Sequence, residues 1–107
     1  LGALWEIAKA SRVGFKVYRN KLPITKITEK ICSHYLIDPL RLISSGSMLI
    51  TTPRGEDLVH VLEDKGIKAC VVGKITQKGY KLICHDEEEE IDAPGRDELF
   101  ILEEKLK

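Results

Sequence analysis

The sequence of 107 residues lacks the marks of several protein classes. Its three cysteines include no Cys-x-x-Cys pair, so neither a zinc site nor a disulfide framework is indicated, and buried free thiols are expected at Cys32, Cys70 and Cys84. No apolar run approaches the roughly 18 residues that cross a bilayer, and no signal-peptide pattern occurs. We therefore expect a cytoplasmic protein that makes no contact with membranes.

An excess of one charge is also missing. The 17 basic and 17 acidic residues cancel, whereas proteins that bind nucleic acid carry a basic excess. The charges are nevertheless separated along the chain: residues 1–85 contain 14 Lys and Arg against 7 Asp and Glu, and residues 86–107 contain 3 against 10. We expect no nucleic-acid partner, and a basic body that carries an acidic end.

Motifs of self-contained enzymes are absent as well. The sequence has no Walker loop, no Gly-x-Ser-x-Gly elbow and no Gly-x-Gly-x-x-Gly loop, so neither a P-loop site nor a nucleophilic hydrolase is indicated. His34, His60 and His85 have no ligand at metal spacing, which favours surface histidines. The basic segment 9–30 is interpreted as a solvated face, and the acidic run 86–90 as a solvated extension of a hairpin. The residues themselves therefore predict no catalytic group and no metal ligand.

The helices of the chain are predicted from its apolar periodicity. Apolar residues make up 43% of the sequence and charged residues 32%, which is enough for one globular domain with a single core. Apolar side chains recur at helical spacing over residues 2–12, about 25–36, 53–65 and 96–107. Thr52 is the expected N-cap of the third helix, and Gly66 closes it. The last segment could equally be a strand.

The strands are predicted from alternation and β-branching. Residues 14–18 alternate as a half-buried strand, and residues 47–52 are expected to form a buried central strand. Residues 67–83 are interpreted as two strands joined at Gln77-Lys78, a hairpin that sets Ile75 opposite Tyr80. The order of elements predicts an α+β fold: a mixed β-sheet with packed helices, partly ferredoxin-like.

Two places carry candidate binding residues. In the loop 44–47, hydroxyl groups and backbone N–H groups around Gly46 could hold a phosphate or carboxylate, or the loop is a turn that starts a strand. Glu6 lies next to Trp5 at the edge of the first apolar stripe, where it either lines a cleft or makes a cap or interdomain contact. The substrate-binding candidates are Glu6, Ser45, Gly46 and Ser47.

Three segments together resemble a known family. The opening GALWEIAKASRVGFKV resembles the C-terminal domain shared by aminoimidazole ribonucleotide (AIR) synthase (PurM), selenophosphate synthetase, thiamine-phosphate kinase and the hydrogenase expression/formation protein HypE. The stretch LIDPLRLISSGSMLITTP is similar to a HypE-like Asp-Pro-Leu segment, and GIKACVVGKIT resembles the family's paired strand. The matching positions are Gly2, Leu4, Glu6, Ala8, Ser11, Gly14, Asp38, Pro39, Leu40, Gly46, Leu49, Pro53, Gly73, Ile75 and Thr76. The resemblance covers residues 1–85 and is closest to HypE and AIR synthase-related proteins.

This resemblance implies a function that the residues alone do not show. It implies a PurM C-terminal domain-like fold over residues 1–107, cut from a longer protein whose N-terminal domain dimerises and binds ATP and magnesium. The domain would complete the substrate cleft beside that N-terminal domain and would be inactive alone. The implied partners are its own N-terminal domain, a second copy in a homodimer, and another hydrogenase maturation protein.

Two readings from other classes stay open. In the first, the chain is a regulatory domain of the ferredoxin-like kind, which binds a small metabolite and catalyses nothing. In the second, it is a dimerisation or docking module that uses its acidic end as the contact, so that added salt would weaken binding.

Overall fold

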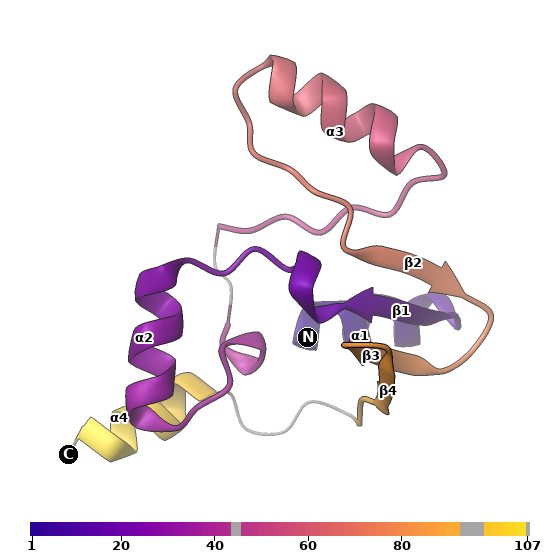
Figure 1. Cartoon of the computed structure of the whole chain (residues 1–107). Coiled ribbons are helices and arrows are strands. Elements are labelled where there is room, and N and C mark those ends of the chain that lie inside the picture. Colours follow the sequence, from indigo (N-terminus) through magenta and orange to yellow (C-terminus); the bar gives the residue numbers. More distant parts are fainter. Residues whose placement is uncertain (44–45, 93–97, 107) are drawn as a thin grey trace.

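The chain folds as an α+β domain, as expected (Figure 1). The computed structural model describes residues 1–43, 46–92 and 98–106, with the backbone alone at 98 and 99. Its elements in chain order are α1 (Gly2–Ser11), β1 (Gly14–Tyr18), the 3-10 turn η1 (Arg19–Lys21), α2 (Lys26–Tyr35), the 3-10 turn η2 (Pro39–Arg41), α3 (Gly55–Asp64), β2 (Gly73–Thr76), β3 (Tyr80–Cys84), β4 (Glu87–Glu90) and α4 (Glu98–Leu106). None of the described helices is long and apolar enough to cross a membrane.

The sheet has the order β2-β1-β3-β4, with β1 inside it. β1 runs antiparallel to β2 and parallel to β3, so Phe15 lies between Ile75 and Tyr80. The expected hairpin of residues 67–83 is therefore wrong, because the two strands are separated by β1. Phe15 and Val17 are each 1% exposed, and the burial of these side chains explains why β1 takes the inner position.

The acidic run forms the strand β4, where only a solvated extension of a hairpin was expected. β4 pairs antiparallel with β3, and the two are joined by a two-residue turn at His85 and Asp86. Both turn residues have positive φ, 50° and 67°, as a type I′ hairpin turn requires. The four glutamates of β4 are exposed, so the expectation of a solvated run is confirmed, and their charge protects this sheet edge against further pairing.

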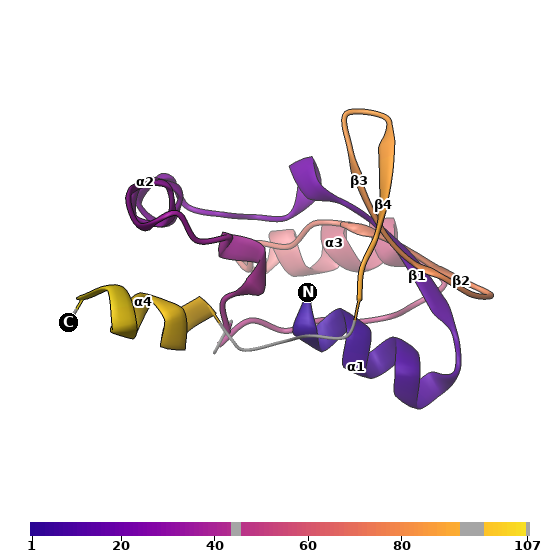
Figure 2. The ribbon, with the colours of Figure 1, turned by 90° about the horizontal axis from the view of Figure 1, so that it is seen from below.

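The core lies on one face of the sheet. Phe15, Val17 and Leu82 from the strands pack with Ala8 from α1 and Leu40 from η2. Figure 2 shows α1 on one side of the strands, while the opposite side of the sheet is open. A one-sided core of this kind is typical of sheets that leave one face to solvent or to a partner.

The helix predictions are largely confirmed. Thr25 caps α2, and its Oγ1 accepts a hydrogen bond of 3.2 Å from the Thr28 N–H group. Gly66 follows the end of α3 with a φ of 78°, as expected for a closing glycine. The last segment is a helix, α4, and not a strand. Thr52 does not cap α3, which begins at Gly55; its hydroxyl accepts from the Arg54 N–H group instead.

The expected strand at residues 47–52 is wrong. This segment is irregular, and its side chains are open to solvent, with Met48 85% and Ile50 48% exposed. β-branched residues favour extended backbone, but a strand also needs a neighbour that accepts its hydrogen bonds. The described sheet consists of β1 to β4 alone, and the segment 47–52 pairs with none of these strands.

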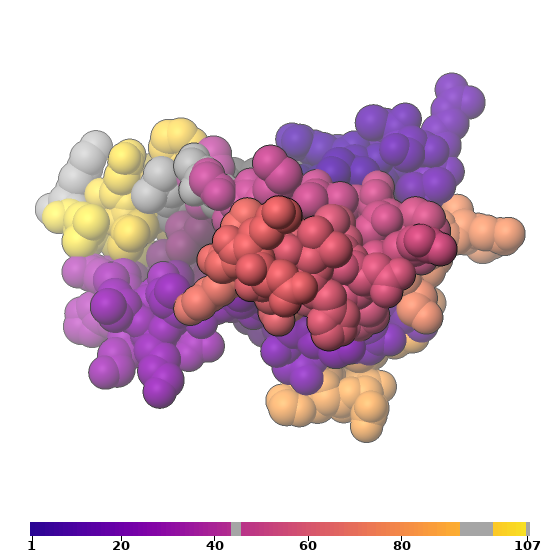
Figure 3. All heavy atoms as spheres, turned by 90° about the horizontal axis from the view of Figure 1, so that it is seen from above, coloured from indigo at the N-terminus to yellow at the C-terminus, as the bar shows by residue number. Residues whose placement is uncertain are grey.

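The molecule is more open than its mass predicts. It exposes 8477 Å² of surface, whereas a compact monomer of 12.1 kDa exposes about 6,000 Å². Its radius of gyration is 14.8 Å, against about 13 Å for a compact chain of this length. Figure 3 shows α3 standing forward of the rest of the molecule, and Figure 1 shows α2 and α4 together at the other end.

Candidate functional site

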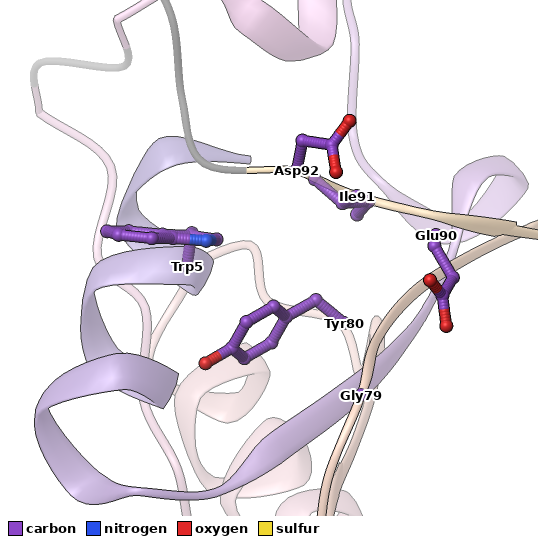
Figure 4. Close-up of a pocket in the computed structure, with 6 residues that line it drawn as sticks. All are labelled: Trp5, Gly79, Tyr80, Glu90, Ile91 and Asp92. Carbon is purple, nitrogen blue, oxygen red and sulfur yellow. The ribbon is translucent and has the colours of Figure 1, made fainter.

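A surface hollow lies between α1, the start of β3 and the chain that leaves β4 (Figure 4). Its volume is about 280 Å³. The residues that line it are Trp5, Gly79, Tyr80, Glu90, Ile91 and Asp92. Segments far apart in the sequence thus meet at one place, which makes this hollow the first candidate for a binding site.

The walls of the hollow are held by the core. The rings of Trp5 and Tyr80 lie 6.3 Å apart between centroids and are tilted by 57°. Behind them, the Tyr80 ring packs 5.4 Å from that of Phe15, which is 1% exposed. The Ile91 N–H group donates a hydrogen bond of 2.8 Å to the carbonyl oxygen of Tyr80, and this bond fixes the third wall. The aromatic surface is therefore in place before any ligand arrives.

The charge of the hollow is negative. Glu90 and Asp92 are exposed, and Figure 4 shows their carboxylates pointing in opposite directions from the chain. Within the described part of the chain, neither carboxylate forms an ion pair, and no basic side chain lines the hollow. The Lys9 ammonium lies 5.0 Å from the centre of the Trp5 ring, a distance at which a cation is attracted to the indole.

A second charged group lies on the open face of the sheet. Glu88 on β4 bridges two lysines, with Lys81 Nζ 3.0 Å from one of its oxygens and Lys16 Nζ 3.2 Å from the other. Hydrogen bonds from Lys81 and Lys16 and the charges of both lysines hold the pKa of Glu88 below its usual value. Lys74 stands beside Lys16 in the strand register and is exposed. Glu88 on β4 offsets the charges of Lys16 and Lys81, whereas Lys74 leaves the β2 side of this face basic.

The predicted site residues lie apart from these groups. Glu6 is exposed on α1 next to Trp5, but it does not line the hollow. Gly46 and Ser47 are exposed, and Gly46 has a φ of 88°, a conformation that favours glycine. Ser45 lies outside the described residues. In the described ranges no hydrogen bond or ion pair joins Glu6 to Gly46 or Ser47, so their grouping in one cleft stays a prediction.

Sequence reasoning missed the hollow for two reasons. Trp5 was placed in an apolar stripe and Tyr80 in a hairpin, so nothing brought the two rings together. Glu90 and Asp92 belong to a segment that was expected to be solvated and to pack against nothing. His34, His60 and His85 are exposed, and among the described residues no three His, Cys, Asp or Glu side chains group as a metal site needs. All three cysteines are thiols; Cys32 is buried as expected, but the expectation of burial is wrong for Cys70, which is exposed, and Cys84 is half-buried.

The comparison with family models decides the family. The model described as AIR synthase related protein, C-terminal domain, matches residues 1–85. The chain belongs to this family. The match runs from α1 to β3, so Trp5 and Tyr80 fall inside the family segment, while β4, Asp92 and α4 lie beyond it. Neither the comparison with curated proteins nor that with solved structures returned a match.

Proposed function

We propose that this AIR synthase-related domain works as the substrate-side half of an ATP-dependent, HypE-like protein. It packs against an ATP-binding domain and completes the substrate cleft beside it, as the family resemblance of residues 1–85 implies. The observation that carries this proposal is the excess surface of the domain. That excess, roughly 2,400 Å² over a compact monomer, is larger than the roughly 800 Å² that one partner loses in a standard interface.

Apolar side chains on the exposed surface support a docked state. Ile27 on α2 is 72% exposed and Leu36 at its end is 85% exposed. α4 belongs to the same end of the molecule, because the Lys105 ammonium donates hydrogen bonds to the carbonyl oxygens of Tyr35 and Leu36. Large apolar side chains exposed at one end of a domain favour an interaction surface there. We therefore assign the end formed by α2 and α4 to the interface with the ATP-binding domain.

The described residues do not themselves fit Mg-ATP. The hollow presents two carboxylates, which repel phosphate groups, and the chain has no glycine-rich phosphate loop. ATP and magnesium accordingly belong to the partner domain in this proposal. Glu6, Ser45, Gly46 and Ser47 are the residues that this chain offers to the shared cleft. The proposal places the protein in the cytoplasm, in hydrogenase maturation or a related activation of an amide or carbonyl oxygen.

Calorimetric titration with Mg-ATP tests the proposal. We expect no binding by the 107-residue chain and clear binding by the same chain joined to an ATP-binding domain of the AIR synthase type from the same source. Binding of ATP by the chain alone, or by neither protein, would overturn it.

The assigned interface has its own test. Ile27→Glu is expected to weaken copurification of the two domains at least about tenfold, because it buries a charge in an apolar contact. Ala10→Glu, which adds the same charge at an exposed position on α1, serves as the matched control. Equal copurification of both variants would contradict the assignment of α2.

A regulatory domain that binds a small metabolite is the second candidate function, and the hollow beside Trp5 is the observation that favours it. This function requires that the 107-residue chain bind its metabolite without the partner domain. Loss of metabolite binding when the chain is separated from the ATP-binding domain would contradict it.

A further inference from the structure

We propose that the hollow between Trp5 and Tyr80 is a binding site for a small organic cation, a guanidinium or primary ammonium group on a short chain. The inference deepens the second candidate function, which concerns the same hollow, and it does not depend on the ATP-dependent role, because the ligand is opposite in charge to ATP and to phosphorylated substrates.

The aromatic walls supply the first part of the recognition. Tryptophan offers the strongest cation–π attraction of the aromatic side chains. The Lys9 ammonium lies 5.0 Å from the centre of the Trp5 ring, so the indole already attracts a cation, and a cationic ligand competes with this lysine. Tyr80 is held against Phe15 and cannot turn away without opening the core. Rigid walls reduce the entropy that a ligand must lose on binding.

The carboxylates supply the second part. Glu90 and Asp92 place two negative charges on the lining, and none of the described side chains that line the hollow is basic. Lys81 is next to Glu90 in the strand register, but its ammonium contacts Glu88, 3.0 Å away. Figure 4 shows the two carboxylates turned in opposite directions, but the negative potentials that they produce add in the hollow and favour a positive ligand over a neutral one of the same shape.

The size of the hollow limits the ligand. Its volume of about 280 Å³ is at the lower end of the roughly 300–1,000 Å³ that small-molecule sites occupy. This space suits a planar guanidinium with a short alkyl chain that lies against the rings. A nucleotide carries the wrong charge for this lining.

The sole tryptophan provides the measurement. Trp5 is the only tryptophan of the chain, so its fluorescence reports on the hollow alone. The probes are n-butylguanidinium and n-butylurea, which share a planar head group and an alkyl chain and differ in charge. At fixed ionic strength we expect the guanidinium to change the Trp5 emission and to bind roughly tenfold more tightly than the urea. The indole N–H resonance of Trp5 gives a second reading of the same site.

A matched pair of variants separates the site from the general charge of the protein. The double variant Glu90→Gln/Asp92→Asn is expected to reduce the preference for the cation to about twofold or less. The control Glu87→Gln/Glu89→Gln removes the same charge from exposed positions on the same strand that do not line the hollow, and it is expected to keep most of the preference.

Three results would overturn the proposal. These are equal binding of both probes, a change of preference as large in the control as in the double variant, and emission changes without a shift of the Trp5 resonance. Because all four substituted side chains are exposed, the variants are expected to fold, and far-UV circular dichroism checks this. None of these outcomes bears on ATP binding, so failure here leaves the test of the proposed function intact.

Discussion

Replacing Phe15 tests the strand order of the sheet. Phe15 is 1% exposed and packs against Tyr80, with Ile75 on its other side in the register. Truncation of a buried phenylalanine to alanine costs about 3–5 kcal/mol. Domains of this size are stable by about 5–15 kcal/mol, and the open shape of this one favours the lower end. We therefore expect Phe15→Ala to remove most of the free energy of unfolding.

The edge position provides the comparison. If β2 and β3 were a hairpin, Ile75 would face Tyr80 directly and would be a core residue. In the structure Ile75 is 45% exposed on the edge strand β2, so Ile75→Ala is expected to cost roughly 1 kcal/mol. The ratio of the two losses therefore distinguishes the observed order from the hairpin.

Urea denaturation of the purified chain measures both losses of unfolding free energy. The unfolding is monitored by circular dichroism and by Trp5 fluorescence, and coincident transitions from the two signals indicate two-state unfolding. Phe15→Leu, expected to cost about 1 kcal/mol, keeps the test informative if the alanine variant does not fold. Equal losses for Phe15→Ala and Ile75→Ala would refute the central position of β1.

Three further predictions concern charge, close packing and capping. The pKa of Glu88 is lowered, so its ion pairs stabilise the folded protein above the usual carboxyl pKa of 4.5, and this stabilisation is lost as the pH falls below 4.5. Glu88→Gln should therefore reduce the change of the urea midpoint with pH in this range. The control Glu87→Gln should leave that change as it is. Gly73→Ala should destabilise the protein by about 1–3 kcal/mol or more, because its Cβ would overlap the backbone of β1, whereas Gly2→Ala meets nothing within 4 Å and should be neutral or stabilising in a thermal melt. Thr25→Ala should cost about 1 kcal/mol by removal of the α2 cap, seen as a loss of helical ellipticity; an unchanged signal would contradict this role.

Local sequence patterns were sufficient to predict where the helices and β1 lie in the chain. The apolar spacing of α2 and the glycine after α3 are encoded within a few residues, and the structure confirms both, whereas the expected Thr52 cap of α3 is wrong. Strand pairing is decided by distant segments, so Ile75 was paired with Tyr80, and the pairing of each with Phe15 was missed. β4 went unrecognised because four glutamates have low strand propensity by themselves; their strand forms because β3 supplies the ladder and lysines.

The sequence by itself determined the fold class, the family segment 1–85 and the separation of a basic body from an acidic end. Those properties follow from composition, periodicity and motif, which are read along the chain. Only the tertiary structure decided that Trp5 meets Tyr80 and that Glu90 and Asp92 join them at one hollow. The physical reason is that β1 enters the sheet between β2 and β3, and β4 folds back along β3. This arrangement depends on burying the Phe15 face, a gain that no local pattern expresses.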